Sequence, residues 1–250
     1  MIQFLSFSLD ISDVLIIALV GLLTGMSKTG VHGAGMLAVP LLVFVFGAQA
    51  SSGVMLPILI LADIFGVWYY HRHAEWKYLK ILFPWSALGV VIGTLTGKYI
   101  DDDMFRSIMA VVIVISIILM IWLEKAKNKN ISAGIWFTIG IGVAGGFTSM
   151  VGNLAGAVMA VYFLSIHLPK NSYVGTTAWL FAVVNFFKIP FHLFVWKTIK
   201  TDTVLLDLMT LPAILLGAYL GIVIVRNLSE KIYRWFIIIT TLIAALAMLL

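Results

Sequence analysis

A glycine-rich stretch at residues 21–35 recurs in altered form 121 positions later, at residues 142–156. Further matches follow at the same offset or one close to it, and they pair Gly53 with Gly175, Asp63 with Asn185, Pro84 with Pro212, Gly89 with Gly217 and Gly93 with Gly221. The chain is therefore two copies of one plan. Duplicated, interrupted hydrophobic segments of this kind are typical of secondary transporters whose binding site lies between the halves.

The composition places the protein in a membrane. Hydrophobic residues make up 62% of the 250 residues and charged residues only 11%, whereas soluble domains carry about a quarter charged residues. We expect an all-α integral membrane protein with one membrane domain over residues 1–250. The net charge of +5 comes from short loops between apolar segments, so we exclude a nucleic-acid partner.

Apolar runs long enough to cross a bilayer, which needs roughly 17 to 25 residues, form two trios. They occupy residues 52–70, 79–97, 105–123, 173–196, 204–225 and 232–250. A glycine-rich pair precedes each trio, at 14–30 with 34–48 and at 134–150 with 153–166. Each pair either forms a re-entrant hairpin that meets its counterpart at mid-membrane or crosses fully. Repeat one then covers about 14–123, a cytoplasmic linker 124–132, and repeat two about 133–250.

Loop charges predict the orientation. Ten cations lie on one side of the predicted membrane and four on the other, and the cation-rich side should be cytoplasmic. Both termini then face outward. Because each repeat makes an odd number of crossings, the two copies must be inverted relative to each other.

Two of the 16 lysines and arginines remain inside the predicted membrane segments. Lys28 lies at the tip of the first glycine-rich pair and Lys188 lies inside the span 173–196. A lysine at the centre of a spanning helix costs about 2.5 to 3.5 kcal/mol on insertion scales, so each needs a partner, water or a ligand. An anion is the simplest candidate.

The first tip places hydroxyls and an imidazole beside this cation, in Ser27, Thr29 and His32. A short helix that begins near Gly33 would direct its positive end into the gap, which favours a small oxyanion. Alternatively, the tip is a surface turn and Lys28 extends to water. In the second copy Asn153 stands where His32 stands in the first.

Asp63 and Asn185 lie about ten residues beyond the paired Gly53 and Gly175, which is about 15 Å into each helix. Lys188 and His192 follow Asn185 on the same helical face. Asp63 and His192 could carry a coupled proton. Equally, Asp63 could be a structural partner of Lys28, and His192 could have an interfacial structural role.

The strips of glycine at every fourth position, from Gly89 to Gly97 and from Gly217 to Gly221, allow close helix contact. They either pack within the monomer or build a homodimer. Motifs of metalloproteases, P-loop enzymes and dinucleotide enzymes are not found, so we expect no enzyme, no cofactor and no metal site.

These residues resemble the TauE/SafE family of sulfite exporters. The resemblance is carried by residues 35–40 of the first glycine-rich pair, by its second copy at 142–156, by residues 175–177 and by the helices of Pro84 and Pro212. It spans nearly the whole chain and implies export of sulfite or of small organosulfonates.

Our leading hypothesis is a multi-pass transporter of the inner (plasma) membrane that exports such a small anion by alternating access, with proton coupling as an option. The predicted substrate-binding residues are Ser27, Lys28, Thr29, His32, Asn153, Asn185 and Lys188, and the candidates for coupling are Asp63 and His192. An importer or channel for another small ion, or a membrane scaffold that transports nothing, are the alternatives.

Overall fold

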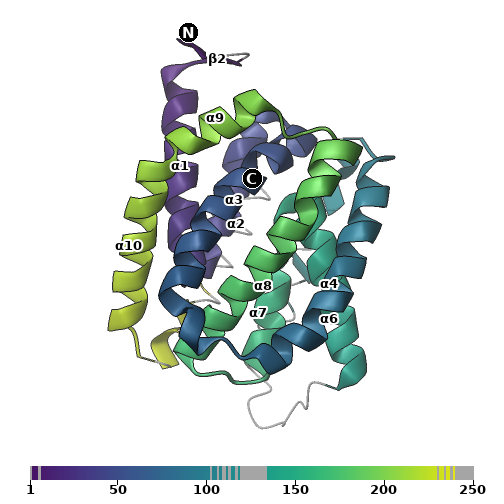
Figure 1. The fold of residues 1–250 in the computed structure, drawn as a ribbon, viewed down its shortest axis with the longest axis vertical. Coiled ribbons are helices and arrows are strands. Elements are labelled where there is room, and N and C mark those ends of the chain that lie inside the picture. The colour runs from purple at the N-terminus through teal and green to yellow at the C-terminus, as the bar shows by residue number, and fades with distance from the viewer. Residues whose placement is uncertain are drawn as a thin grey trace.

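The structure is a computed structural model in which the helices of both halves pack into one bundle (Figure 1). It describes residues 2–4, 7–101, 103–105, 107, 108, 111, 114, 115, 118, 134–229, 231–233, 235, 236 and 239. Most of the predicted spans 105–123 and 232–250 and the whole linker 124–132 lie outside the described residues. A short antiparallel strand pair, β1 (Ile2–Phe4) and β2 (Phe7–Leu9), precedes the first helix.

The described helices of the first half are α1 (Ile11–Lys28), α2 (His32–Phe46), α3 (Ala48–Tyr70) and α4 (Trp76–Gly97). Those of the second half are α6 (Ile135–Gly152), α7 (Ala155–Ser165), α8 (Lys170–Pro190), α9 (Thr201–Met209) and α10 (Leu211–Asn227). Short 3₁₀ and π segments, η1 (His71–His73) and η2 (Phe191–Val195), follow α3 and α8. The all-helical membrane class predicted from composition is therefore confirmed.

Within the described residues, five helices are long and apolar enough to cross a membrane, namely α1, α3 with η1, α4, α6, and α8 with η2. The pair α9 and α10 makes a sixth candidate that is bent by 51°. The predicted span 204–225 therefore falls on a bent pair of helices and not on one straight helix. Pro212 lies in the first turn of α10, where a missing N–H costs nothing, and it disfavours continuation of the preceding helix.

Helices α3 and α8 pass each other in opposite directions at the centre of the bundle (Figure 1). A side chain on Gly175 of α8 would meet the backbone around Tyr70, at the end of α3. A side chain on Gly53 of α3 would meet Thr198, beyond the end of α8. Asp63 and Asn185 each lie ten residues beyond these glycines, so both are at the middle of the α3–α8 pair.

Glycines also bring helices of opposite halves into backbone contact. A Cβ atom on Gly25 of α1 would meet the carbonyl oxygen of Ile214 in α10, and one on Gly146 of α6 would meet that of Ser86 in α4. In return, Gly217 of α10 lies against Leu22 and Gly89 of α4 lies against Val143. The glycine strips therefore pack inside the protein, with α1 beside α10 and α4 beside α6.

The loops that connect the helices lie at two opposite ends of the bundle, and contacts between loops and helix ends define each end. At one end, Lys170 Nζ donates to the carbonyl oxygens of Val225 and Leu228, and Gly175 packs on the residues around η1. At the other end, Gln49 Nε2 donates to the Gly97 carbonyl and Gly53 packs on Thr198. Among the described loops, the first end carries those that the sequence predicts to be cation-rich, which include Arg72, Lys170 and Arg226.

Replacing Gly146 by alanine should lower the melting temperature in detergent by several degrees, because the new methyl group would overlap the Ser86 carbonyl oxygen. Overpacking of this kind typically costs about 1 to 3 kcal/mol. Gly140→Ala, on the same helix but with open space around its Cβ, is the matched control and should melt like the parent. Equal melting temperatures for both variants would contradict the close α4–α6 contact.

Candidate functional site

The two glycine-rich pairs form helical hairpins whose tips lie at the middle of the bundle. Helix α1 ends at Lys28, the chain turns through Gly30 at a positive φ of 123°, and α2 begins at His32. Helix α6 ends at Gly152, Asn153 adopts a left-handed conformation with φ 55°, and α7 begins at Ala155. Both tips contact the central pair α3 and α8 through the side chains described next.

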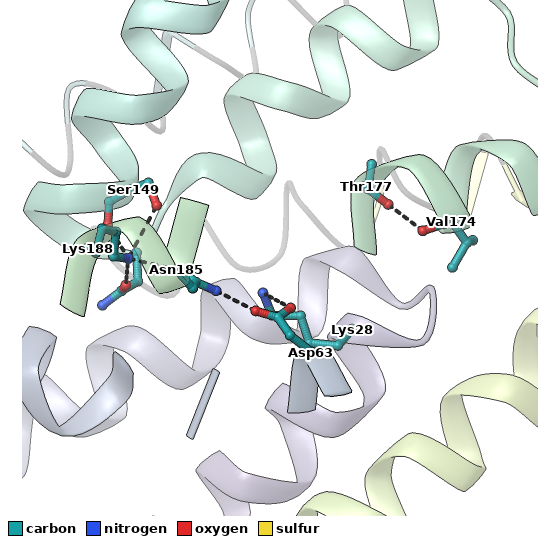
Figure 2. Close-up of polar contacts among 8 residues, drawn as sticks. Lys28, Asp63, Ser149, Val174, Thr177, Asn185 and Lys188 are labelled. Atoms are coloured by element: carbon teal, nitrogen blue, oxygen red, sulfur yellow. Dashed lines mark hydrogen bonds and ion pairs between the residues drawn. The ribbon is translucent and has the colours of Figure 1, made fainter. Parts of the chain in front are cut away.

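A continuous chain of polar contacts runs through this region (Figure 2). Lys28 Nζ lies 2.8 Å from Asp63 Oδ1, and Asn185 Nδ2 donates to Asp63 Oδ2 at 2.6 Å. On the other side of Asn185, its Oδ1 accepts from Lys188 Nζ at 3.1 Å. The side chain of Lys28 is 7% exposed and that of Asp63 fully buried, so these charges are paired away from water.

Lys188 of α8 forms hydrogen bonds with the tip of the second hairpin. Its ammonium donates to Asn153 Oδ1 at 2.6 Å and to the Ser149 carbonyl oxygen at 2.9 Å, with Ser149 Oγ at 3.3 Å. The carbonyl of Ser149 is in the last turn of α6, where helix oxygens favour a positive charge. The fully buried Lys188 therefore orients Ser149, Asn153 and Asn185 together.

A cavity of about 40 Å³ lies between the hairpin tips and the central helices. One water molecule needs only about 10 to 15 Å³ of such space, so the cavity exceeds a single water site. Its polar lining consists of Ser27, Lys28, Ser149, Asn153 and Asn185. The remaining lining is small or apolar and consists of Gly35, Leu59, Ala155, Gly156 and Phe181.

Two helix N-termini contribute to the cavity wall. Ala155 and Gly156 are the first two residues of α7, and Gly35 lies in the first turn of α2. Backbone N–H groups at a helix N-terminus have no partner inside the helix and carry partial positive charge. Together with the Lys28 ammonium they give the cavity the donors and the charge that suit a small anion.

The structure brings together most of the predicted site residues. Ser27, Lys28, Asn153 and Asn185 line the cavity. Asp63 contacts the side chain of Lys28. Lys188 lies behind the cavity wall and donates hydrogen bonds to three residues that line the cavity. Lys188 therefore holds three residues of the cavity wall in place and does not itself line the cavity.

Three predicted residues lie elsewhere or are only partly described. Thr29 Oγ1 donates to carbonyl oxygens of its own helix and lies against Gly221 of α10. His192 is buried, shares a 2.8 Å hydrogen bond between its Nδ1 and Thr198 Oγ1, and packs on Trp196. His32 opens α2, and its side chain lies outside the described part of the structure.

The predicted set omitted several lining residues. Ser149 occupies the position of Lys28 in the second copy, at the offset of 121 residues. Leu59 and Phe181 lie one helical turn before Asp63 and Asn185, so a search of the same helical faces would have found them. The Phe181 ring lies under the Lys28 ammonium, with 4.8 Å from Nζ to the ring centroid. Such a cation–π contact is a further partner for the buried charge.

Hydroxyl groups near the paired glycines have structural roles. Thr177 Oγ1 donates to the carbonyls of Tyr173 and Val174, as Figure 2 shows for Val174. Thr176 Oγ1 accepts from the backbone N–H of Glu75, and Ser52 Oγ donates to the Gln49 carbonyl. These contacts fasten helix ends and do not reach the cavity.

Fold and site together describe a multi-pass α-helical membrane protein with a cavity, lined in part by a lysine, between its hairpin tips and central helices. The family described as "Sulfite exporter TauE/SafE" matches residues 16–248, which is nearly the full length. The chain therefore belongs to the TauE/SafE family, as the sequence resemblance predicted. This membership implies a membrane transporter of sulfite or related anions, in a family of transporters and not of enzymes. No curated protein and no solved structure gives a significant match.

Replacing Lys28 by methionine should lower the free energy of unfolding, because it leaves the Asp63 carboxylate buried without its cation. Loss of one partner of a buried pair typically costs about 3 to 5 kcal/mol. The double variant Lys28→Met with Asp63→Asn removes both charges and should recover most of that loss. Thermal unfolding in detergent measures the difference, and additive losses in the double variant would contradict the pairing.

Proposed function

We propose that the protein exports sulfite or a related small organosulfonate anion by alternating access and binds it in the central cavity. The observation that supports this most directly is a cavity inside the membrane domain with an ammonium group, hydroxyls, amides and two helix N-termini around it. Family membership supports the substrate class. A scaffold would have no need for a buried cavity bordered by charge, since buried charges are costly where they serve no ligand or partner.

In this proposal Lys28 supplies the direct positive contact with the anion. Ser27 and Ser149 donate hydroxyl hydrogen bonds to its oxygens, and the backbone N–H groups of Ala155 and Gly156 add further donors. The Asn153 amide donates one N–H to the Ser52 carbonyl oxygen, and the Asn185 amide donates one to Asp63 Oδ2. The second N–H of each amide would bind the anion. Lys188 keeps the two amides oriented.

The duplicated helices suggest how the cavity could open alternately to the two sides. We propose that the halves are inverted repeats, covering about 14–123 and 133–250, and that the units α1 with α10 and α4 with α6 move against the central pair α3 and α8. The cation-rich end would face the cytoplasm of a cell whose inner (plasma) membrane holds the protein, with both termini outside.

Of the two coupling candidates, only Asp63 contacts a residue that lines the cavity. A proton-coupled cycle would therefore use Asp63. His192 is not part of this proposal, because its described contacts are with Thr198 and Trp196 beyond the end of α8 and not with residues that line the cavity. The glycine strips pack inside the protein and so provide no support for a homodimer.

Replacing both Lys28 and Lys188 by methionine should abolish sulfite binding, because the variant loses both positive charges of the site. Isothermal titration calorimetry on the purified protein measures this. Lys197→Met with Lys200→Met, which removes two exposed lysines, is the matched control and should bind like the parent. If the variant without Lys28 and Lys188 binds sulfite as tightly as the parent, the cavity is not the binding site.

Gly156→Val should block transport with little effect on stability. The new side chain would enter open space, since no atom lies within 4 Å of a Cβ atom at this position, and it would reduce the cavity. Gly140→Val also adds its side chain to open space but lies away from the cavity. Sulfite flux in proteoliposomes should fall at least about tenfold only for Gly156→Val. Equal flux in both variants would show that the anion takes another route.

A further inference from the structure

We propose that Asp63 sets the charge of the anion that the cavity accepts, so that the site takes a monovalent oxyanion in preference to a divalent one. This inference rests on the proposed function, because it concerns the selectivity of the same cavity. It makes Asp63 a specificity-determining residue that acts by opposing the charge of the two buried lysines.

The contacts of Asp63 are those that suit an ionised carboxylate. Lys28 Nζ approaches Oδ1 at 2.8 Å, and Asn185 Nδ2 approaches Oδ2 at 2.6 Å. The Asn185 amide is fixed in this orientation because its oxygen accepts from Lys188. Both neighbours of Asp63 are therefore donors, whereas a protonated carboxyl group would need an acceptor for its hydrogen.

Lys188 carries the charge that Asp63 leaves unmatched. Its ammonium donates to oxygens of Ser149, Asn153 and Asn185, and all of these oxygens are neutral. No carboxylate oxygen of the described residues is in salt-bridge distance of Lys188. The lysine is fully buried, so its charge is screened little by salt.

Two ammonium groups and one carboxylate thus leave one net positive charge around the cavity. The charged groups that face Asp63 are Lys28 from α1 and Lys188 from α8, and α6 contributes only neutral groups to this cluster. A bound monoanion neutralises the cluster. A dianion leaves a net negative charge buried in a medium of low dielectric constant, which is unfavourable.

The test compares methanesulfonate and sulfate, which are similar in size and coordinate through sulfur-bound oxygens but carry one and two negative charges. Calorimetry on the full-length protein should show that the parent binds methanesulfonate more tightly. Asp63→Asn keeps the shape of the side chain and raises the net charge of the cluster by one. The ratio of the two dissociation constants should then shift toward sulfate by about tenfold or more.

A second variant separates charge from local structure. Asp63→Asn combined with Asn185→Asp moves the carboxylate across the hydrogen bond, next to Lys188, and leaves the net charge unchanged. It should keep the preference of the parent for methanesulfonate. If Asp63→Asn does not fold, Asn185→Asp alone serves: its second carboxylate cancels the net charge, so methanesulfonate binding should weaken about tenfold or more.

The outcomes distinguish this inference from the proposed function. A shifted ratio in Asp63→Asn together with a parental ratio in the exchanged variant supports it. An unchanged ratio in Asp63→Asn, a preference for sulfate in the exchanged variant, or undiminished methanesulfonate binding by Asn185→Asp overturns the inference alone. Failure of the parent to bind sulfite, methanesulfonate and sulfate overturns both the inference and the proposed function.

Discussion

The hydrogen bond between Asp63 and Asn185 joins the two halves of the protein at the middle of the bundle, and the arrangement of the site depends on it. Each of its partners holds a lysine, Lys28 on one side and Lys188 on the other. A buried ammonium group needs acceptors for its hydrogens, which Lys188 finds in neutral oxygens, and is stabilised further where a carboxylate opposes its charge, as for Lys28. The pair therefore fixes where the tips of both hairpins lie against α3 and α8.

Glycine makes this polar centre geometrically possible. Helices of opposite halves approach so closely that a methyl group at Gly25 or Gly146 would overlap a backbone carbonyl oxygen. In lipid, van der Waals contact between such small residues is a main source of helix association. These contacts hold α1 against α10 and α4 against α6. The hairpin tips, with their irregular backbone at Gly30 and Asn153, lie inside the protein and next to the cavity.

The predicted residues that line the cavity are those whose polarity alone made them conspicuous in the sequence. Lys28, Asn153 and Asn185 stand out in apolar segments, because a polar group in a membrane helix needs a reason to be there. Thr29 does not line the cavity, because a hydroxyl at a helix end can equally bond its own backbone, and this one does. Leu59 and Phe181 were missed because apolar residues in an apolar helix give no signal unless the functional face is already known.

The sequence by itself determined the membrane class and the buried charges that need a partner, since hydrophobicity and unpaired charge have large, local costs in a bilayer. It left open whether the glycine strips pack within the monomer or between two copies. Only the tertiary structure decided which groups pair. In the structure Lys28 pairs with the Asp63 carboxylate, whereas Lys188 donates to neutral oxygens of Ser149, Asn153 and Asn185. The tertiary structure also placed a bend of 51° inside the expected span 204–225, at Thr210 between α9 and α10. Those choices depend on the directions of side chains across several helices, and the spacing of residues along one helix does not specify them.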